Sequence, residues 1–160
     1  MKKIEIYTDG ACSGNPGRGG YGAVLIYKNA RRELSAAYRQ TTNNRMELLA
    51  AVVALEALKE PCEAELFSDS KYLVDAIELG WVLRWRKNNW MRNKKEPAIN
   101  TDLWERLLVL LEIHRVHFRW VKGHAGHTEN ERCDCLARDA IKDAEESDSF
   151  LEDFGYVEKA

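Results

Sequence analysis

The chain has 160 residues, of which 45% are hydrophobic, and its formal net charge is -2. This length and composition are typical of one domain with a single sizeable core. No apolar run approaches the roughly 18 residues that a membrane span needs, and no export signal is evident, so we expect a cytoplasmic protein without a membrane partner. For the same reasons we expect free thiols at Cys12, Cys62, Cys133 and Cys135.

The charge is distributed unevenly along the chain. Residues 143–160 hold seven acids and one lysine, about -6, so the preceding residues carry about +4. We therefore expect one folded domain at residues 1–142 and an acidic C-terminal tail at residues 143–160. Two alternatives stay open for the tail, disorder or weak docking through its scattered apolar side chains.

Three strands with short links are expected first. Ile4 and Ile6 alternate with more polar residues, which predicts a strand that ends near Asp9. After the loop GACSGNPGRGG come an apolar strand, YGAVLIYK, and a third strand near residues 34–38. Short links favour an antiparallel meander.

Helices and strands then alternate. Leu48, Val52 and Leu55 share one helical face, which predicts a buried central helix that ends before Pro61. The remaining predicted elements are a strand at 64–68, a helix at 70–79, a basic Trp-rich segment closed by Pro97, a helix at 102–112, a strand at 116–121 and a helix at 129–144. Strands separated by whole helices pair in parallel, so we expect an α/β fold with a five-stranded mixed sheet flanked by helices.

The basic segment from Arg84 to Lys95 contains six cations and no acid. It interleaves Trp85 and Trp90, with Trp81 just upstream, and cationic and aromatic side chains together suit nucleic-acid phosphates and bases. A solvated basic helix whose tryptophans pack on the core is an equally good interpretation.

One glycine pattern imitates a nucleotide site. Gly17, Gly19 and Gly22 match G-x-G-x-x-G, but that motif requires a following helix, and AVLIYK predicts a strand. We expect a tight hairpin whose glycines supply positive φ angles.

A second pattern imitates a zinc site. His124, His127, Cys133 and Cys135 are zinc-ligand types within twelve residues. On a helix, residues two apart point roughly 200° apart, so the two cysteines are poorly placed to bind one ion.

Four carboxylates are better placed for a joint site. Asp9 and Asp69 each end a predicted strand, Glu47 stands near the start of the central helix, and Asp134 lies early on the last helix. Strand C-termini and helix N-termini gather at one edge of an α/β sheet. Clustered carboxylates repel one another unless cations neutralise them, and they suit a hard ion such as Mg²⁺.

Each carboxylate also has a structural alternative. Asp9 suits a turn, and Asp69 suits the N-terminus of the next helix. Glu47 could close a capping box with Asn44 as the N-cap. Asp134 could pair with Arg138 four residues later.

The chain resembles bacterial type I ribonuclease H in four runs, in the family's order and spacing: YTDGACSGNPGRGGYG, TTNNRMELLAA, SDSKYLVDAI and WVKGHAGHTENERCDCLA. The resemblance covers about residues 4–141. It implies the ribonuclease H-like fold and an endonuclease, expected as a monomer, that cuts the RNA strand of an RNA/DNA hybrid and leaves 5'-phosphate and 3'-hydroxyl ends. It implies two Mg²⁺ ions, or Mn²⁺, held by Asp9, Glu47, Asp69 and Asp134, with His124 as a mobile catalytic histidine.

The same resemblance implies a set of substrate contacts. For the RNA strand these are Gly10, Cys12, Asn15, Asn43, Asn44 and Ser70. For the DNA strand they are Thr42, Trp81 and Asn100. Residues 81–99 correspond to the family's basic handle, with Trp85, Arg86 and Lys87. Capping of the central helix by residues 42–44 could coexist with this role.

Three positions depart from the family pattern. Gln40 stands where an arginine is frequent, although Arg39 is adjacent, and Lys71 and Asp75 stand where glutamine is frequent. We expect these departures to affect affinity more than chemistry. Two other functions remain as alternatives: a non-catalytic hybrid-binding module, which should have lost a carboxylate, and an integrase or transposase relative, which should lack the handle and the TTNNRMEL run.

Overall fold

Five strands form one mixed sheet in the order β3-β2-β1-β4-β5 in the computed structural model, which describes residues 1–123 and 126–157. β1 (Lys2–Ser13), β2 (Gly17–Tyr27) and β3 (Ala30–Thr41) form the antiparallel meander that the short links predict. β4 (Cys62–Ser68) pairs in parallel with β1, and β5 (Arg115–Trp120) pairs in parallel with β4, because helical connections precede both. The predicted α/β fold is confirmed.

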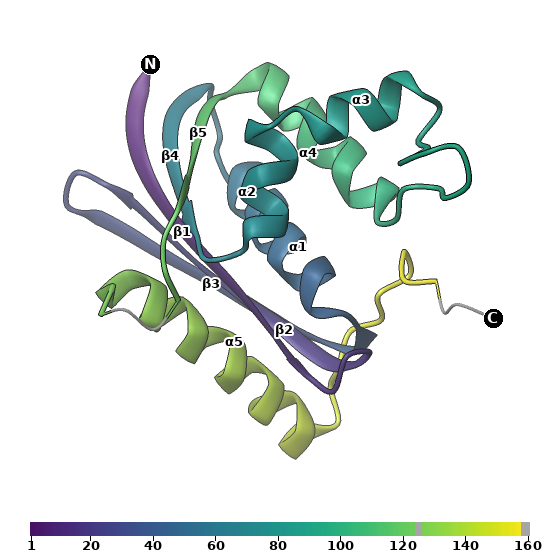
Figure 1. Ribbon diagram of the computed structural model, residues 1–160. Helices are drawn as coiled ribbons and strands as arrows, with labels where there is room; N and C mark the ends of the chain where they lie inside the picture. The colour runs from purple at the N-terminus through teal and green to yellow at the C-terminus, as the bar shows by residue number, and fades with distance from the viewer. Residues whose placement is uncertain (124–125, 158–160) are drawn as a thin grey trace.

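Helices cover both faces of this sheet (Figure 1). α1 (Asn43–Glu56), α2 (Lys71–Glu78), α3 (Trp81–Lys87) and α4 (Thr101–Ile113) lie on one side. α5 (Thr128–Ser147) crosses the other side, against β1, β2 and β3. In the described part of the chain, none of these helices combines the length and the apolarity needed to cross a membrane.

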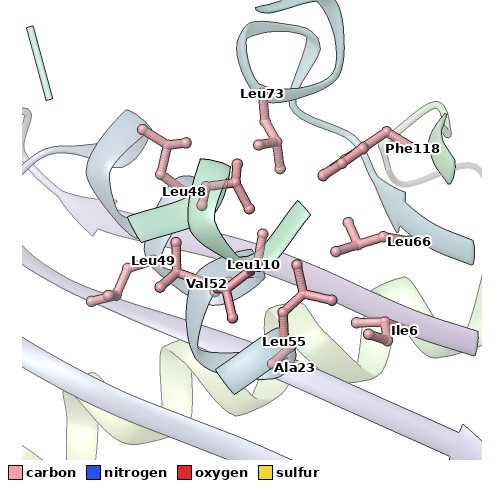
Figure 2. Packing of buried hydrophobic residues seen from close by; sticks show 14 of the residues in the cluster. Ile6, Ala23, Leu48, Leu49, Val52, Leu55, Leu66, Leu73, Leu110 and Phe118 are labelled. Carbon is pink, nitrogen blue, oxygen red and sulfur yellow. The ribbon is translucent and has the colours of Figure 1, made fainter. Parts of the chain in front are cut away.

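The main core lies between the sheet and α1. Figure 2 shows Leu48, Val52 and Leu55 of α1 packed among strand residues such as Ile6 and Leu66, all five fully buried. α4 packs on α1 from the other side, so burial extends round more of the helix than the predicted stripe. Burying each large aliphatic side chain contributes roughly 1.5–3 kcal/mol. α1 is therefore a rigid support for any site at its N-terminus.

The C-terminal segment docks on the sheet. α5 continues across residue 142 to Ser147, and the chain then turns back so that the Leu151 N–H donates to the Ala37 carbonyl at 3.0 Å. Phe150 is buried in a second small core with Ile141 on α5. Docking therefore describes residues 149–153, whereas the side chains of Phe154 and Val157 are exposed.

Candidate active site

Asp9 and Asp69 meet where β1 runs past the end of β4. The parallel ladder between these strands ends at the pair Tyr7 and Phe67, and β4 ends at the next residue. The prediction that the first strand ends near Asp9 is wrong: β1 continues to Ser13, because β2 still pairs with it on its other side. Asp9 thus lies on a strand whose parallel neighbour has stopped, and Asp69 is the first residue beyond that neighbour. Both occupy the open edge at which α/β sheets form sites.

Glu47 joins them from α1. This helix starts at Asn43, and its N-cap is Thr42, whose hydroxyl accepts a hydrogen bond from the Arg45 N–H at 3.2 Å. The alternative with Asn44 as the cap is therefore wrong, because that residue is already inside the helix. Glu47 is then not at the third helical position and closes no capping box. Its side chain extends towards Asp9 instead.

Gly10 allows β1 to approach α1 closely. A Cβ atom at this position would lie 2.6 Å from the Glu47 nitrogen and 2.8 Å from the Met46 carbonyl carbon. Both atoms belong to the backbone and can yield only if the helix moves. The missing side chain of Gly10 therefore sets the distance between strand and helix, and with it the distance between Asp9 and Glu47.

Three carboxylates form a tight, largely buried group. One oxygen from each of Asp9, Glu47 and Asp69 lies within 4.8 Å of the other two. Asp9 is 8% exposed and Glu47 is 4% exposed. Burial and the charge of Asp69 raise the pKa of Asp9 from 3.8 to about 7. Burial and the charges of Asp9 and Asp69 raise the pKa of Glu47 well above its usual value.

The donor set of this group fits a divalent cation. Oε2 of Glu47 is buried and has no hydrogen-bond partner among the described residues. A buried acceptor without a partner costs about 1–3 kcal/mol, and a bound cation would remove that cost together with the repulsion between the carboxylates. An all-oxygen donor set is the one that Mg²⁺ and similar hard ions prefer. The group can therefore hold such an ion.

Asp134 lies at the rim of the same site. Its carboxylate forms the predicted i,i+4 ion pair with Arg138 at 3.0 Å and is 22% exposed. It also lines the pocket that contains Asp9, Glu47 and Asp69. The ion pair and a place in the site are thus compatible, and the structure brings all four predicted carboxylates to one pocket.

This pocket has a volume of about 370 Å³ and is open to solvent. Four of the predicted RNA-strand contacts line it: Gly10, Asn43, Asn44 and Ser70. Lys71, one of the departures from the family pattern, also lines it, with its ammonium 4.7 Å from the centre of the Trp120 ring. The pocket therefore unites the carboxylates with residues from β1, α1 and the start of α2.

Sequence reasoning did not single out several other lining residues. Tyr72 borders the main pocket, and Lys122, Asn130 and Glu131 border a smaller recess beside Asp9, Asp69 and Asp134. The sequence feature that could have identified them is their position in the runs SDSKY, WVKG and TENER, which belong to the segments that resemble type I ribonuclease H. The predicted His124 lies outside the described residues.

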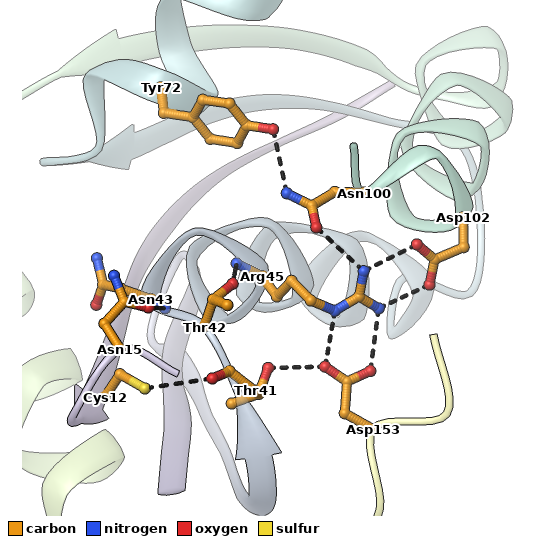
Figure 3. A network of polar contacts seen from close by, with 10 residues as sticks. All are labelled: Cys12, Asn15, Thr41, Thr42, Asn43, Arg45, Tyr72, Asn100, Asp102 and Asp153. Atoms are coloured by element: carbon orange, nitrogen blue, oxygen red, sulfur yellow. Dashed lines mark hydrogen bonds and ion pairs between the residues drawn. The ribbon is translucent and has the colours of Figure 1, made fainter. Parts of the chain in front are cut away.

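The loop after β1 is tied to the start of α1. The side-chain oxygen of Asn15 accepts a hydrogen bond from the Asn43 N–H at 3.1 Å (Figure 3). The Cys12 thiol donates to the Thr41 carbonyl at 3.6 Å. Ser70, on the other side of the pocket, caps α2 by accepting from the Leu73 N–H at 3.2 Å. These hydrogen bonds fix the backbone at the edges of the pocket. Contact of these residues with RNA stays a prediction.

The basic segment forms the short helix α3 and a long loop. Trp81 and Trp85 line a groove of about 400 Å³ that also includes Asn44 of the active-site pocket. Trp85 packs edge-on against the buried Trp104, with ring centres 6.3 Å apart. Arg86 and Lys87 are exposed. The tryptophans therefore pack on the core and also line a groove, and the contact of this segment with nucleic acid stays a prediction.

The glycine pattern is not a nucleotide site. Gly17, Gly19 and Gly22 lie within β2, which continues as a strand. The helix that a nucleotide-binding G-x-G-x-x-G motif needs does not follow them. The expectation of positive φ angles is wrong at these three positions. Gly22 instead provides space, because a Cβ atom there would collide with the Cys133 carbonyl oxygen on α5. Small residues on β2 let α5 lie directly on the sheet.

The described residues also contain no zinc-type cluster. The Cys133 thiol is buried and donates to the Tyr7 carbonyl at 3.2 Å, while Cys135 is only partly buried. Within the described ranges, the one group of potential ligands close enough to share an ion is the carboxylate group.

Arg39, adjacent to Gln40 in the sequence, is paired with the C-terminal segment. Its guanidinium pairs with Glu152 at 3.1 Å and with Asp148 at 3.7 Å, and it lies 5.7 Å from the centre of the Phe150 ring. Two acids of the C-terminal segment therefore offset the charge of Arg39, the sequence neighbour of Gln40.

Comparison with known proteins agrees with this architecture. The family model described as RNase H matches residues 1–142. A Ribonuclease H from Desulforamulus reducens is 68% identical over 142 residues, which cover 89% of each chain. A Ribonuclease HI from Synechocystis is 58% identical over 135 residues, which cover 84% of each chain.

Solved structures show the same similarity. LC9-RNase H1, a type 1 RNase H with the type 2 active-site motif, superposes with a TM-score of 0.79 at 32% identity, over 89% of this chain and 74% of that one. LC11-RNase H1 in complex with an RNA/DNA hybrid superposes with a TM-score of 0.68 at 26% identity, over 88% of this chain and 98% of that one. The fold, the clustered carboxylates and these matches together show that the chain belongs to the ribonuclease H family, as a bacterial type I member.

Proposed function

We propose that this protein is an endonuclease that hydrolyses the RNA strand of RNA/DNA hybrids and leaves 5'-phosphate and 3'-hydroxyl ends. The observation that carries the proposal is the group of Asp9, Glu47 and Asp69, with ligand oxygens within 4.8 Å, in a chain of the ribonuclease H family. The hybrid bound to the related LC11-RNase H1 supports the choice of substrate.

The cofactor that we propose is a pair of Mg²⁺ ions, with Mn²⁺ as a substitute, held by these three carboxylates and Asp134. When bound, such ions lower the pKa of a water molecule and neutralise negative charge on the phosphate. The chain contributes the geometry: Gly10 sets the spacing of Asp9 and Glu47, and burial keeps both carboxylates in a low-dielectric site where charge interactions are strong.

The polar residues around the pocket would place the hybrid on the carboxylates. Gly10, Cys12, Asn15, Asn43, Asn44 and Ser70 would contact the RNA strand, whose 2'-hydroxyl distinguishes it from DNA. Thr42, Trp81 and Asn100 would hold the DNA strand, and Trp85, Arg86 and Lys87 would add the electrostatic attraction of the handle. His124 would assist proton transfer or product release. A monomer in the cytoplasm stays our expectation.

The two alternative functions make different predictions about the products. A non-catalytic module would bind hybrid and cut nothing. An integrase or transposase relative would act on duplex DNA. The complete set of four carboxylates in one pocket favours catalysis over the first alternative, and the groove between the handle and Asn44 favours a hybrid substrate over the second.

A single experiment separates these functions. The protein is incubated with end-labelled RNA/DNA hybrid, RNA duplex and DNA duplex, with Mg²⁺ or with EDTA, and Asp9→Asn is run in parallel. We expect cleavage of the RNA strand of the hybrid alone, only with Mg²⁺, and a large loss in the variant. Equal cutting of all three duplexes, or full activity of Asp9→Asn, would contradict the proposal.

A further inference from the structure

Arg45 is the most extensively bonded buried cation among the described residues. Its side chain is 3% exposed and lies at the start of α1. Nε and Nη2 donate to Asp153 at 2.7 and 3.0 Å, and Nη1 and Nη2 donate to Asp102 at 2.9 and 2.7 Å. Nη1 also donates to the Asn100 side-chain oxygen at 3.2 Å (Figure 3). All five N–H groups of a guanidinium are accounted for by these bonds.

Two distant segments thus converge on one side chain. Asp102 belongs to the first turn of α4, and Asp153 belongs to the C-terminal segment, where its side chain is 8% exposed. The Thr41 hydroxyl donates to the same Asp153 carboxylate at 2.7 Å. The guanidinium and the Asp153 carboxylate are buried, whereas the Asp102 side chain is 44% exposed. Because the buried guanidinium is hydrogen-bonded to both carboxylates, it has very little freedom to move. Arg45 can therefore hold a further side chain that it contacts in one orientation.

Arg45 also contacts Asn100. The backbone of Asn100 is left-handed, with φ at 62°, and its side chain is held on two sides. Its oxygen accepts from Arg45, and its amide nitrogen donates to the Tyr72 hydroxyl at 3.2 Å. A guanidinium can only donate hydrogen bonds, so Arg45 forces the amide oxygen towards itself and the NH₂ group away. One of the two N–H groups then bonds Tyr72, and the other has no partner among the described residues.

Asn100 lines one pocket, and its partner Tyr72 lines two others. Asn100 and Thr42 line a pocket of about 620 Å³ together with residues 155–157. Tyr72 lines both the carboxylate pocket and the groove of the handle. A phosphate oxygen can only accept hydrogen bonds, so a spare N–H favours phosphate binding, whereas the flipped amide would present an oxygen and repel it.

We propose that Arg45 is a positioning residue for hybrid binding: anchored by Asp102 and by Asp153 of the C-terminal segment, it orients the Asn100 amide so that an N–H group faces a phosphate of the DNA strand. This inference rests on the proposed function, in which Asn100 contacts that strand. It also gives the acidic C-terminal segment an indirect role in substrate binding through Asp153, although a carboxylate carries the wrong charge to contact phosphate itself.

A double-mutant cycle tests the inference. KM and kcat are measured on a labelled hybrid for the full chain with Arg45→Lys, with Asn100→Ala and with both. A lysine keeps the charge and lacks the fork that contacts both carboxylates and Asn100 together. We expect Arg45→Lys to raise KM about fivefold, the effect of losing one hydrogen bond, with kcat within about twofold. In the Asn100→Ala background, Arg45→Lys should raise KM no further.

Two further variants keep the test decisive. Arg106→Lys alters another arginine that pairs with a carboxylate between α4 and α1, that of Glu56, and should leave KM unchanged. Asp153→Asn keeps the shape of the side chain but removes its charge and replaces one of its two acceptor oxygens by an NH₂ group, while the Arg45 contacts with Asp102 and Asn100 stay available. Its smaller rise in KM should also vanish in the Asn100→Ala background.

The inference is overturned if either change raises KM by the same factor with and without Asn100, since Arg45 would then act through the fold in general. An unchanged KM in Asp153→Asn overturns the role of the C-terminal segment. Failure of the wild-type protein to cut hybrid contradicts the proposed function instead, so the two failures are distinguishable.

Discussion

Replacing Asp9 by asparagine should make the metal-free protein more stable while it abolishes cleavage. In the folded protein, burial and Asp69 raise the pKa of Asp9 from 3.8 to about 7. Such a difference corresponds to about 4 kcal/mol of penalty for the charged form, at about 1.4 kcal/mol per pKa unit. Because Asp9 titrates together with Glu47, part of this penalty is shared, and we expect a gain of about 2–4 kcal/mol.

The sign of the pH dependence follows from the direction of this pKa change. The folded state binds the proton more tightly than the unfolded state, so between about pH 4 and pH 7 the folded protein holds more protons, and wild-type stability falls as the pH rises through this window. The asparagine side chain of the variant does not titrate. The stability advantage of Asp9→Asn should therefore be absent near pH 4 and complete above about pH 8.

The assay is urea unfolding followed by circular dichroism at pH 4, 6 and 8 in EDTA. At pH 8 the gain corresponds to a rise of about 5–15 °C in Tm for a chain of this size. Asp139→Asn, at an exposed position on α5, is the matched control and should change little. Added Mg²⁺ should stabilise the wild type more than the variant. Equal or lower stability of Asp9→Asn at pH 8 would refute the reasoning that the clustered charges are uncompensated without metal.

Other predictions follow from the same geometry. Gly10→Ala should destabilise the protein by about 1–3 kcal/mol and lower kcat, because the new methyl group pushes β1 away from α1; unfolding and kinetics measured together check this, and a neutral effect would contradict the close approach. Glu47→Gln should lose more activity than Asp134→Asn, since Glu47 belongs to the tight group and Asp134 lies at its rim; equal kcat values would argue against this division. Neutralising Arg86 and Lys87 should weaken hybrid binding and lower the slope of log K against log salt by about 2, whereas unchanged binding at low and high salt would make them plain surface.

Much of the fold was predictable because its signals are local. Alternation in residues 4–6 marks β1, a helical stripe including Leu48, Val52 and Leu55 marks α1, and short links mark the meander. Errors occurred where a second segment decides the outcome. β1 continues past Asp9 only because β2 pairs with it there. Gly20 and Gly22 of β2 leave no room for a side chain because α5 lies directly on them.

The candidate site shows the same division. Local periodicity was enough to predict that Asp69 follows a strand and that Glu47 and Asp134 lie early on helices, but it placed Asp9 at a strand end, whereas Asp9 lies inside β1. The formation of the tight group by Asp9, Glu47 and Asp69, with Asp134 at the rim, depends on how the elements pack in three dimensions. The same packing allows Asp153 to close an ion-pair network with Arg45, 108 residues earlier in the chain. Periodicity records which face of an element is buried, but a contact across the chain depends on the packing of every element between its partners.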